Sequence, residues 1–70
     1  MEELIFAQRI AEAIKHSGFT QKEIAGQLRL SEGNITNWKN GKNLPSVDTL
    51  FRLCKILDVS ADYLLGLADQ

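Results

Sequence analysis

Residues 20–41 read TQKEIAGQLRLSEGNITNWKNG, and this stretch contains the start and stop signals of two short helices. Thr20 and Glu23 have the spacing of a capping box, in which the threonine hydroxyl accepts from the Glu23 amide and the glutamate reaches back to Thr20. Ser31 is a residue type that begins a helix, and Gly41 is a type that follows a helix end. Only about three residues separate the two helices, so the sequence predicts a sharp turn between them.

Apolar residues at helical spacing predict which face of each of these two helices is buried. Ile24 and Leu28 mark the inner face of the first helix, and Ile35 and Trp38 mark that of the second. Trp38 lies three residues after Ile35, on the same face, so we expect it in the core rather than stacked on a ligand.

The outward face of the helix after Ser31 is left with short, mostly polar side chains, namely Glu32, Gly33, Thr36 and Asn37. Amides and hydroxyls can hydrogen-bond the edges of DNA bases, whereas this face offers no apolar patch to a partner helix. Asn37 is the most informative, because one planar amide can contact both N6 and N7 of adenine. An exposed asparagine is also an ordinary surface residue, and that interpretation stays open.

Three more helices are predicted outside this stretch, from apolar periodicity and from caps such as Ser46 and Ser60. The five expected helices cover about residues 3–16, 20–28, 31–39, 46–57 and 60–65. Phe19 is expected to turn inward. The fourth helix is expected to bury Val47, Leu50, Phe51, Cys54 and Leu57. The sequence therefore predicts an all-α fold of five helices, in one domain spanning residues 1–70.

Cys54 is the only cysteine and His16 the only histidine, so neither an internal disulfide nor a zinc site of four cysteine or histidine ligands can form. Cys54 lies in an apolar pattern and is expected to be a small buried hydrophobe. No activated nucleophile or phosphate-binding glycine loop is present, so we expect no enzyme activity, cofactor, metal or small-molecule site. No apolar run reaches the roughly 18 residues of a membrane span, and the acidic start is unlike a signal peptide, so a soluble cytoplasmic protein is expected.

The net charge of −1 argues against a nucleic-acid ligand, but the charges are unevenly distributed. Between residues 33 and 47 the only charged residues are Lys39 and Lys42, whereas residues 1–4 and 59–70 carry acids and no bases. The middle of the chain is therefore the candidate surface for an anion.

The distributed pattern TQKEIA at 20–25, LS at 30–31, ITNWKNGK at 35–42 and PS at 45–46 resembles the phage-repressor (Cro/CI-like, XRE-type) helix-turn-helix family. The resemblance covers about residues 4–66 and implies a regulator of transcription, most often a repressor, that inserts the helix after Ser31 into the major groove of double-stranded DNA. It implies base contacts by Glu32, Gly33 and Asn37, helped by Asn34 and Thr36. The phosphate contacts that it implies, with neighbouring lysines added, are Gln21, Lys22, Lys39, Asn40, Lys42 and Asn43.

Three residues depart from what the family usually needs. Gly33 has no side chain with which to read a base, and Glu32 can only accept a hydrogen bond. Arg29 stands where the turn usually has a glycine with positive φ, at a cost of about 1 kcal/mol. Either Arg29 is strained in the left-handed region or the turn has been rebuilt.

One short helix covers only half of an operator, so a homodimer on a two-fold DNA site is expected, with its two reading helices about 34 Å apart. Tyr63, Leu64 and Leu67 are the candidate interface, because the last helix is more apolar than its own domain requires. Two alternatives stay open. One is a protein-interaction module of the same fold with little or no DNA binding, and the other is the antitoxin of a toxin–antitoxin pair.

Overall fold

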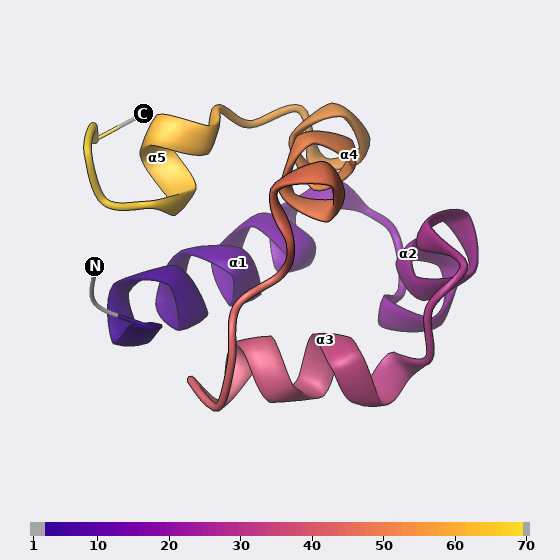
Figure 1. Cartoon of the computed structure of the whole chain (residues 1–70). Helices are drawn as coiled ribbons and strands as arrows, with labels where there is room; N and C mark the ends of the chain where they lie inside the picture. Colours follow the sequence, from indigo (N-terminus) through magenta and orange to yellow (C-terminus); the bar gives the residue numbers. More distant parts are fainter. Residues whose placement is uncertain (1–2, 70) are drawn as a thin grey trace.

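The computed structural model describes residues 3–69, in which five α-helices follow one another (Figure 1). They are α1 (Glu3–Ser17), α2 (Gln21–Leu28), α3 (Glu32–Lys39), α4 (Val47–Leu57) and α5 (Ala61–Leu64). No strand occurs in residues 3–69, and the predicted all-α class is confirmed. The observed bounds differ from the expected ones by one residue at most, mainly because the expected ranges included the N-cap residue.

The caps at three helix starts are those that the sequence predicts. The capping box of α2 is complete, with the Glu23 amide donating to Thr20 Oγ1 at 3.1 Å and the Thr20 amide donating to Glu23 Oε1 at 2.8 Å. Ser46 and Ser60 accept backbone hydrogen bonds at the starts of α4 and α5. Ser31 precedes α3 in extended backbone, but its hydroxyl caps no backbone amide.

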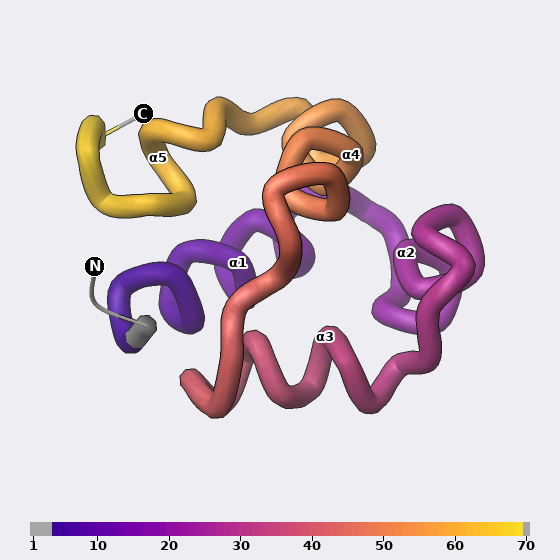
Figure 2. Tube along the Cα trace, viewed as in Figure 1, coloured from indigo at the N-terminus to yellow at the C-terminus, as the bar shows by residue number. Residues whose placement is uncertain are grey.

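The core lies where α1 passes between α3 and α4 (Figure 2), with α2 and α5 closing its two ends. Its most deeply buried side chains come from all five helices: Phe6, Ile10, Ile24, Ile35, Leu53 and Leu64. Trp38 is 3% exposed, which confirms its expected place in the core. No helix within residues 3–69 is long and apolar enough to cross a lipid bilayer.

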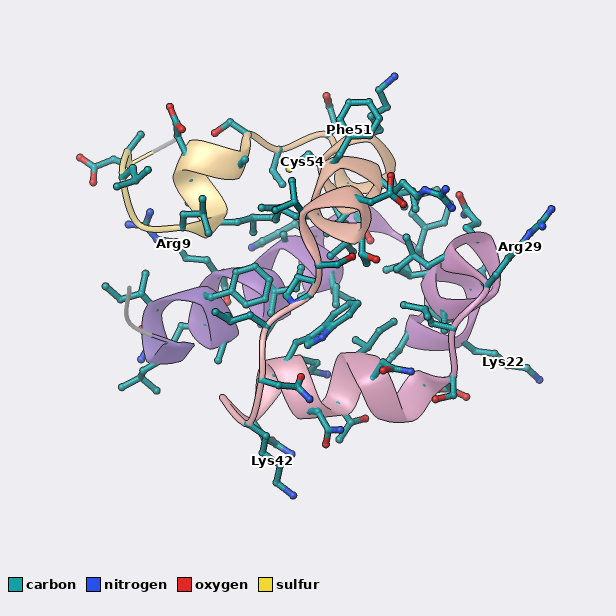
Figure 3. All side chains as sticks on the ribbon, viewed as in Figure 1. Arg9, Lys22, Arg29, Lys42, Phe51 and Cys54 are labelled. Atoms are coloured by element: carbon teal, nitrogen blue, oxygen red, sulfur yellow. The ribbon has the colours of Figure 1, made fainter. Side chains whose placement is uncertain are left out.

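Three aromatic or aliphatic side chains expected in the core lie at the surface instead. Val47 is 84% exposed and Phe51 58%, because α4 turns Leu53 inward and leaves positions 47 and 51, four residues apart, on its outer face. The Lys55 ammonium lies 4.8 Å from the centre of the Phe51 ring (Figure 3). Phe19 is 39% exposed, because it lies in the short connection between α1 and α2 rather than on a helix face.

Arg29 ends α2 in the left-handed region, with φ 58° and ψ 40°. Its amide donates to Gly26 O at 3.2 Å, and the Leu30 amide donates to Ala25 O at 2.9 Å. This pair of bonds is the Schellman arrangement, in which a residue of positive φ follows the helix. The turn has therefore kept the left-handed geometry that usually takes glycine, and it has not been rebuilt.

Arg9 on α1 holds the C-terminal end of the described chain. Its Nη1 donates to Tyr63 O at 2.6 Å and to Ala68 O at 2.5 Å, and the guanidinium carbon lies 4.7 Å from the centre of the Tyr63 ring. Beside this clamp, Leu64 is 0% exposed. Leu64 thus belongs to the core of its own domain, which corrects its expected place at a dimer interface.

Candidate nucleic-acid interface

The outer face of α3 is the surface that the sequence marks as a DNA reader. Burial of Ile35 and Trp38 leaves Glu32, Gly33 and Thr36 exposed, whereas Asn37 is half-buried beside them. A Cβ added to Gly33 would meet only Ser31 Oγ at 3.6 Å, so open space lies over this position. An α-helix with its side chains is about 10–12 Å wide, which fits the major groove.

Two of the five candidate base contacts differ in how firmly their amides are held. The Asn34 amide donates to Ser31 Oγ at 3.0 Å, so it is already used within the first turn of α3. The Asn37 side chain makes no hydrogen bond to any residue between 3 and 69. Asn37 is therefore the amide on α3 that is free to meet an outside partner.

Gln21 connects the start of α2 to α3. Its Nε2 donates to the Glu32 carbonyl at 3.1 Å and to Thr36 Oγ1 at 2.8 Å, and Lys39 Nζ donates to its Oε1 at 3.1 Å. Gln21 and Lys39 were both expected to contact phosphate, but in the free protein they bind each other. Nothing in the sequence indicates this contact, because the partners lie 11 to 18 residues apart and any of them could be an ordinary surface residue.

Two lysines extend to solvent near the opposite ends of α3. Lys22 projects from α2 and Lys42 from the loop after α3 (Figure 3). The backbone amide of Lys42 donates to Asn37 O at 2.9 Å, so this loop is attached to the end of α3. Asn40 and Asn43 lie exposed on either side of Lys42. The lysines and the asparagine side chains can thus approach DNA phosphates on both sides of the α3 face.

Comparison with known sequences is consistent with this arrangement of α2, turn and α3. Residues 7–70 match the model of the family described as a helix-turn-helix domain, which is nearly the whole chain. The chain belongs to this helix-turn-helix family.

Curated relatives of this helix-turn-helix domain are named as regulators of transcription. ImmR, an HTH-type transcriptional regulator of Bacillus subtilis strain 168, is 41% identical over 59 residues, which cover 84% of this chain and 46% of the relative. The 26 kDa repressor protein of Escherichia phage HK022 is 33% identical over 69 residues, covering 93% of this chain and 29% of the relative. BcrR of Enterococcus faecalis, named a transcriptional activator, is 30% identical over 61 residues, covering 87% and 30%. The chain thus spans less than half the length of each of these three relatives.

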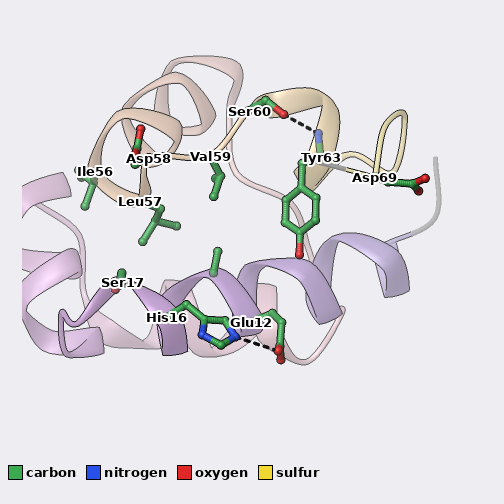
Figure 4. A pocket seen from close by; sticks show the side chains of 11 residues that line it. Glu12, His16, Ser17, Ile56, Leu57, Asp58, Val59, Ser60, Tyr63 and Asp69 are labelled. Carbon is green, nitrogen blue, oxygen red and sulfur yellow. Dashed lines mark hydrogen bonds and ion pairs between the residues drawn. The ribbon is translucent and has the colours of Figure 1, made fainter.

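An open groove of about 680 Å³ lies between α1 and the segment that joins α4 to α5, away from the predicted DNA contacts of this helix-turn-helix domain (Figure 4). Its rim carries the carboxylates of Glu12, Asp58 and Asp69, with His16 held to Glu12 at 3.2 Å. Carboxylates repel phosphate, so this side of the molecule opposes DNA while the lysines beside α3 attract it. The acidic residues of the groove and the lysines that flank α3 therefore lie in different parts of the molecule.

Proposed function

We propose that this protein binds double-stranded DNA sequence-specifically, with α3 in the major groove, and regulates transcription. The observation that carries the proposal is the α3 face itself, which carries the free Asn37 amide and has the solvent-facing lysines Lys22 and Lys42 near its two ends. Membership of the helix-turn-helix family and the names of the relatives support it. A regulator of transcription acts where the chromosome lies, so we also propose a cytoplasmic location.

Asn37 would read adenine through N6 and N7, a contact that discriminates against other bases by about 1–3 kcal/mol. Lys22 and Lys42 would bind phosphates and fix the register of the protein on the duplex without reading sequence. Glu32 would add an acceptor for a cytosine amino group, and Gly33 would allow close approach of the α3 backbone. Base recognition would then depend mainly on the middle of α3.

We further propose that the protein acts as a homodimer on a two-fold operator. The greatest extent of the described chain is 27 Å. One turn of B-DNA is about 34 Å long, so a second copy is needed to fill the next major-groove segment on the same face. The names of the relatives say nothing about assembly, and this part of the proposal depends on the dimensions and on exposed apolar surface.

The dimer surface that we favour is apolar and lies beside the end of α5. Leu67, one of the expected interface residues, is 74% exposed. Leu65, two residues before it, lines a pocket of about 200 Å³ whose other walls are apolar, including the 84% exposed Val47. Tyr63 is half-buried under Arg9 and can contribute only its edge.

The decisive experiment is selection of sequences from a randomised duplex library, with affinity then measured across a salt series. Lys42→Ala should weaken binding to all sequences and reduce the salt slope by about 1, because one phosphate contact is lost. Asn37→Ala should relax the preference at one base position. Lys55→Ala is the matched control, since Lys55 lies over Phe51 on α4 and should change neither quantity.

Absence of both enrichment and salt dependence in the unaltered protein would refute DNA binding and favour the protein-interaction module. The homodimer is tested separately by sedimentation, free and on the selected duplex. Val47→Lys and Leu67→Lys should shift the complex from two copies toward one copy per duplex. Phe51→Lys, a matched change at another exposed apolar side chain, should leave the stoichiometry unchanged. If the unaltered protein sediments as a monomer both at high concentration and on the duplex, the homodimer proposal is refuted.

A further inference from the structure

The orientation of the Gln21 side-chain amide is fixed by two partners whose roles admit no choice. The Glu32 carbonyl oxygen can only accept, so the group facing it at 3.1 Å must be the Nε2 donor. The Lys39 ammonium can only donate, so the group facing it at 3.1 Å must be Oε1. The two contacts agree on a single orientation, and both Gln21 amide protons are thereby assigned to α3.

This orientation decides what the Thr36 hydroxyl does. The second Nε2 proton of Gln21 points at Thr36 Oγ1 over 2.8 Å, so Thr36 is the acceptor in that bond. The hydroxyl proton of Thr36 must then point elsewhere, and no other hydrogen bond of this hydroxyl occurs within residues 3–69. Because Thr36 is exposed on the α3 face, its proton is available to solvent or to DNA.

Lys39 strengthens this arrangement. Its ammonium donates to Gln21 Oε1, which polarises the amide and makes the Nε2 protons better donors to Thr36. The chain of bonds runs from Lys39 through Gln21 to Thr36, so the Thr36 hydroxyl accepts within the protein and keeps its proton for an outside acceptor. A charged donor at the start of such a chain favours this role over the reverse.

We propose that Thr36 is a specificity-determining residue whose hydroxyl donates to a base acceptor in the major groove, and that Gln21 is the positioning residue that fixes this role. The inference rests on the proposed DNA binding and replaces the expectation that Gln21 is primarily a phosphate contact. Guanine, thymine and adenine present acceptors (O6 and N7, O4, and N7), whereas cytosine presents its N4 donor. Cytosine would leave the Thr36 proton unpaired, so we expect the DNA strand that faces Thr36 to disfavour cytosine at one position.

The test compares base preferences rather than overall affinities. At the position facing Thr36, the unaltered protein should bind the thymine duplex about 3- to 10-fold more tightly than the cytosine duplex, which is what one neutral hydrogen bond contributes. Thr36→Val has nearly the same shape without the hydroxyl and should lose most of that ratio. Thr36→Ser keeps the hydroxyl and should retain it.

Gln21→Glu is the variant that separates positioning from mere support of the fold. A carboxylate at 21 has no proton, so the Thr36 hydroxyl would donate to it and present lone pairs to the groove. The new charge should weaken binding to all duplexes, but the thymine-to-cytosine ratio should fall to about 1 or reverse. A ratio that stays unchanged in Gln21→Glu, or in Thr36→Val, overturns the inference.

Two controls keep this failure distinct from failure of the proposed function. If the unaltered protein enriches no sequence, DNA binding fails and the inference falls with it; if it enriches a site that Thr36→Val reads equally well, only the inference falls. Asn37→Ala should change a different base position. In the DNA-free protein, Thr36→Val should shift the Gln21 side-chain amide signal in a nitrogen-15 spectrum, and an unshifted signal would contradict the contact. All variants should keep the unfolding temperature within a few degrees, since both positions lie at the surface.

Discussion

Replacing Arg29 with glycine should stabilise the protein, although it removes a large side chain. Arg29 holds φ at 58°, where an L-residue brings its Cβ too close to the following carbonyl oxygen. Its guanidinium makes no hydrogen bond or ion pair within residues 3–69, and the side chain extends into solvent (Figure 3). The substitution therefore relieves backbone strain and removes no contact of the side chain.

The size of the gain follows from two opposing effects. The left-handed conformation costs an L-residue about 1–2 kcal/mol, and glycine avoids this. Glycine also gives the unfolded chain more freedom, which lowers the stability by about 0.4–1 kcal/mol. The net increase in the free energy of unfolding should be about 0.5–1 kcal/mol. For a domain of this size, that corresponds to about 2–8 °C in unfolding temperature.

Urea and thermal unfolding measure this change, and two further variants control it. Arg29→Ala removes the same side chain but keeps a Cβ, so it should gain nothing. Asp58→Gly addresses the other non-glycine residue with positive φ within residues 3–69, at 55° after the end of α4. It should gain less, because aspartate tolerates this region better than arginine. If the Arg29→Gly variant is no more stable than the Arg29→Ala variant, the positive φ at position 29 does not strain the folded protein.

Four more predictions follow from local geometry. Hydrogen bonds from the Thr20 backbone amide, and secondarily from its hydroxyl, lower the pKa of Glu23 below the usual 4.5. The stability that these bonds contribute is complete above pH 4.5 and is lost as the pH falls through the lowered pKa. Glu23→Gln should therefore flatten the pH dependence of urea unfolding in that acid range, and an unchanged pH dependence would contradict this. Burial raises the pKa of the Cys54 thiol, so at pH 8 an aromatic disulfide reagent should modify the folded protein more slowly than the urea-unfolded one, and equal rates would show an open thiol. A Cβ at Gly66 would lie 2.8 Å from Ile5 Cγ2 at a φ of +80°, so Gly66→Ala should destabilise by about 2 kcal/mol or more in urea. A Cβ added at Gly26, within α2, would meet no atom within 4 Å, so Gly26→Ala should instead stabilise the protein by about 0.5–1 kcal/mol. A lower stability of Gly26→Ala would show that open space around a glycine does not predict the effect of adding a Cβ in this fold.

Much of the helical architecture was predictable because its signals are local. The Thr20 and Glu23 capping box is defined by residues three apart, and the structure contains both of its bonds. Ile35 and Trp38 share one helix face and are both buried. Positive φ at Arg29 was one of two outcomes that the family resemblance left open, and the structure selects it.

The predictions that failed depended on which way a helix faces. Val47 and Phe51 fit a helical apolar pattern, but a second pattern through Leu53 fits equally well, and only packing against the other helices selects between them. Leu64 was expected at a dimer interface because α5 is rich in leucine. It lies in the core instead, next to Tyr63, whose carbonyl accepts a hydrogen bond from Arg9. Periodicity gives the spacing of a buried face and leaves its direction open when two faces are apolar.

The sequence by itself determined the five helices, the caps of α2, α4 and α5, the sharpness of the turn between α2 and α3, and the choice of α3 as the candidate reading helix. Each of these depends on residues within one or two helical turns of each other. The tertiary structure decided which polar groups on that helix are free. Asn37 has a free amide, whereas Gln21 is held by Thr36 and Lys39 across 15 and 18 residues of sequence. A hydrogen bond depends on distances of a few tenths of an ångström between helices, and no local pattern encodes those distances.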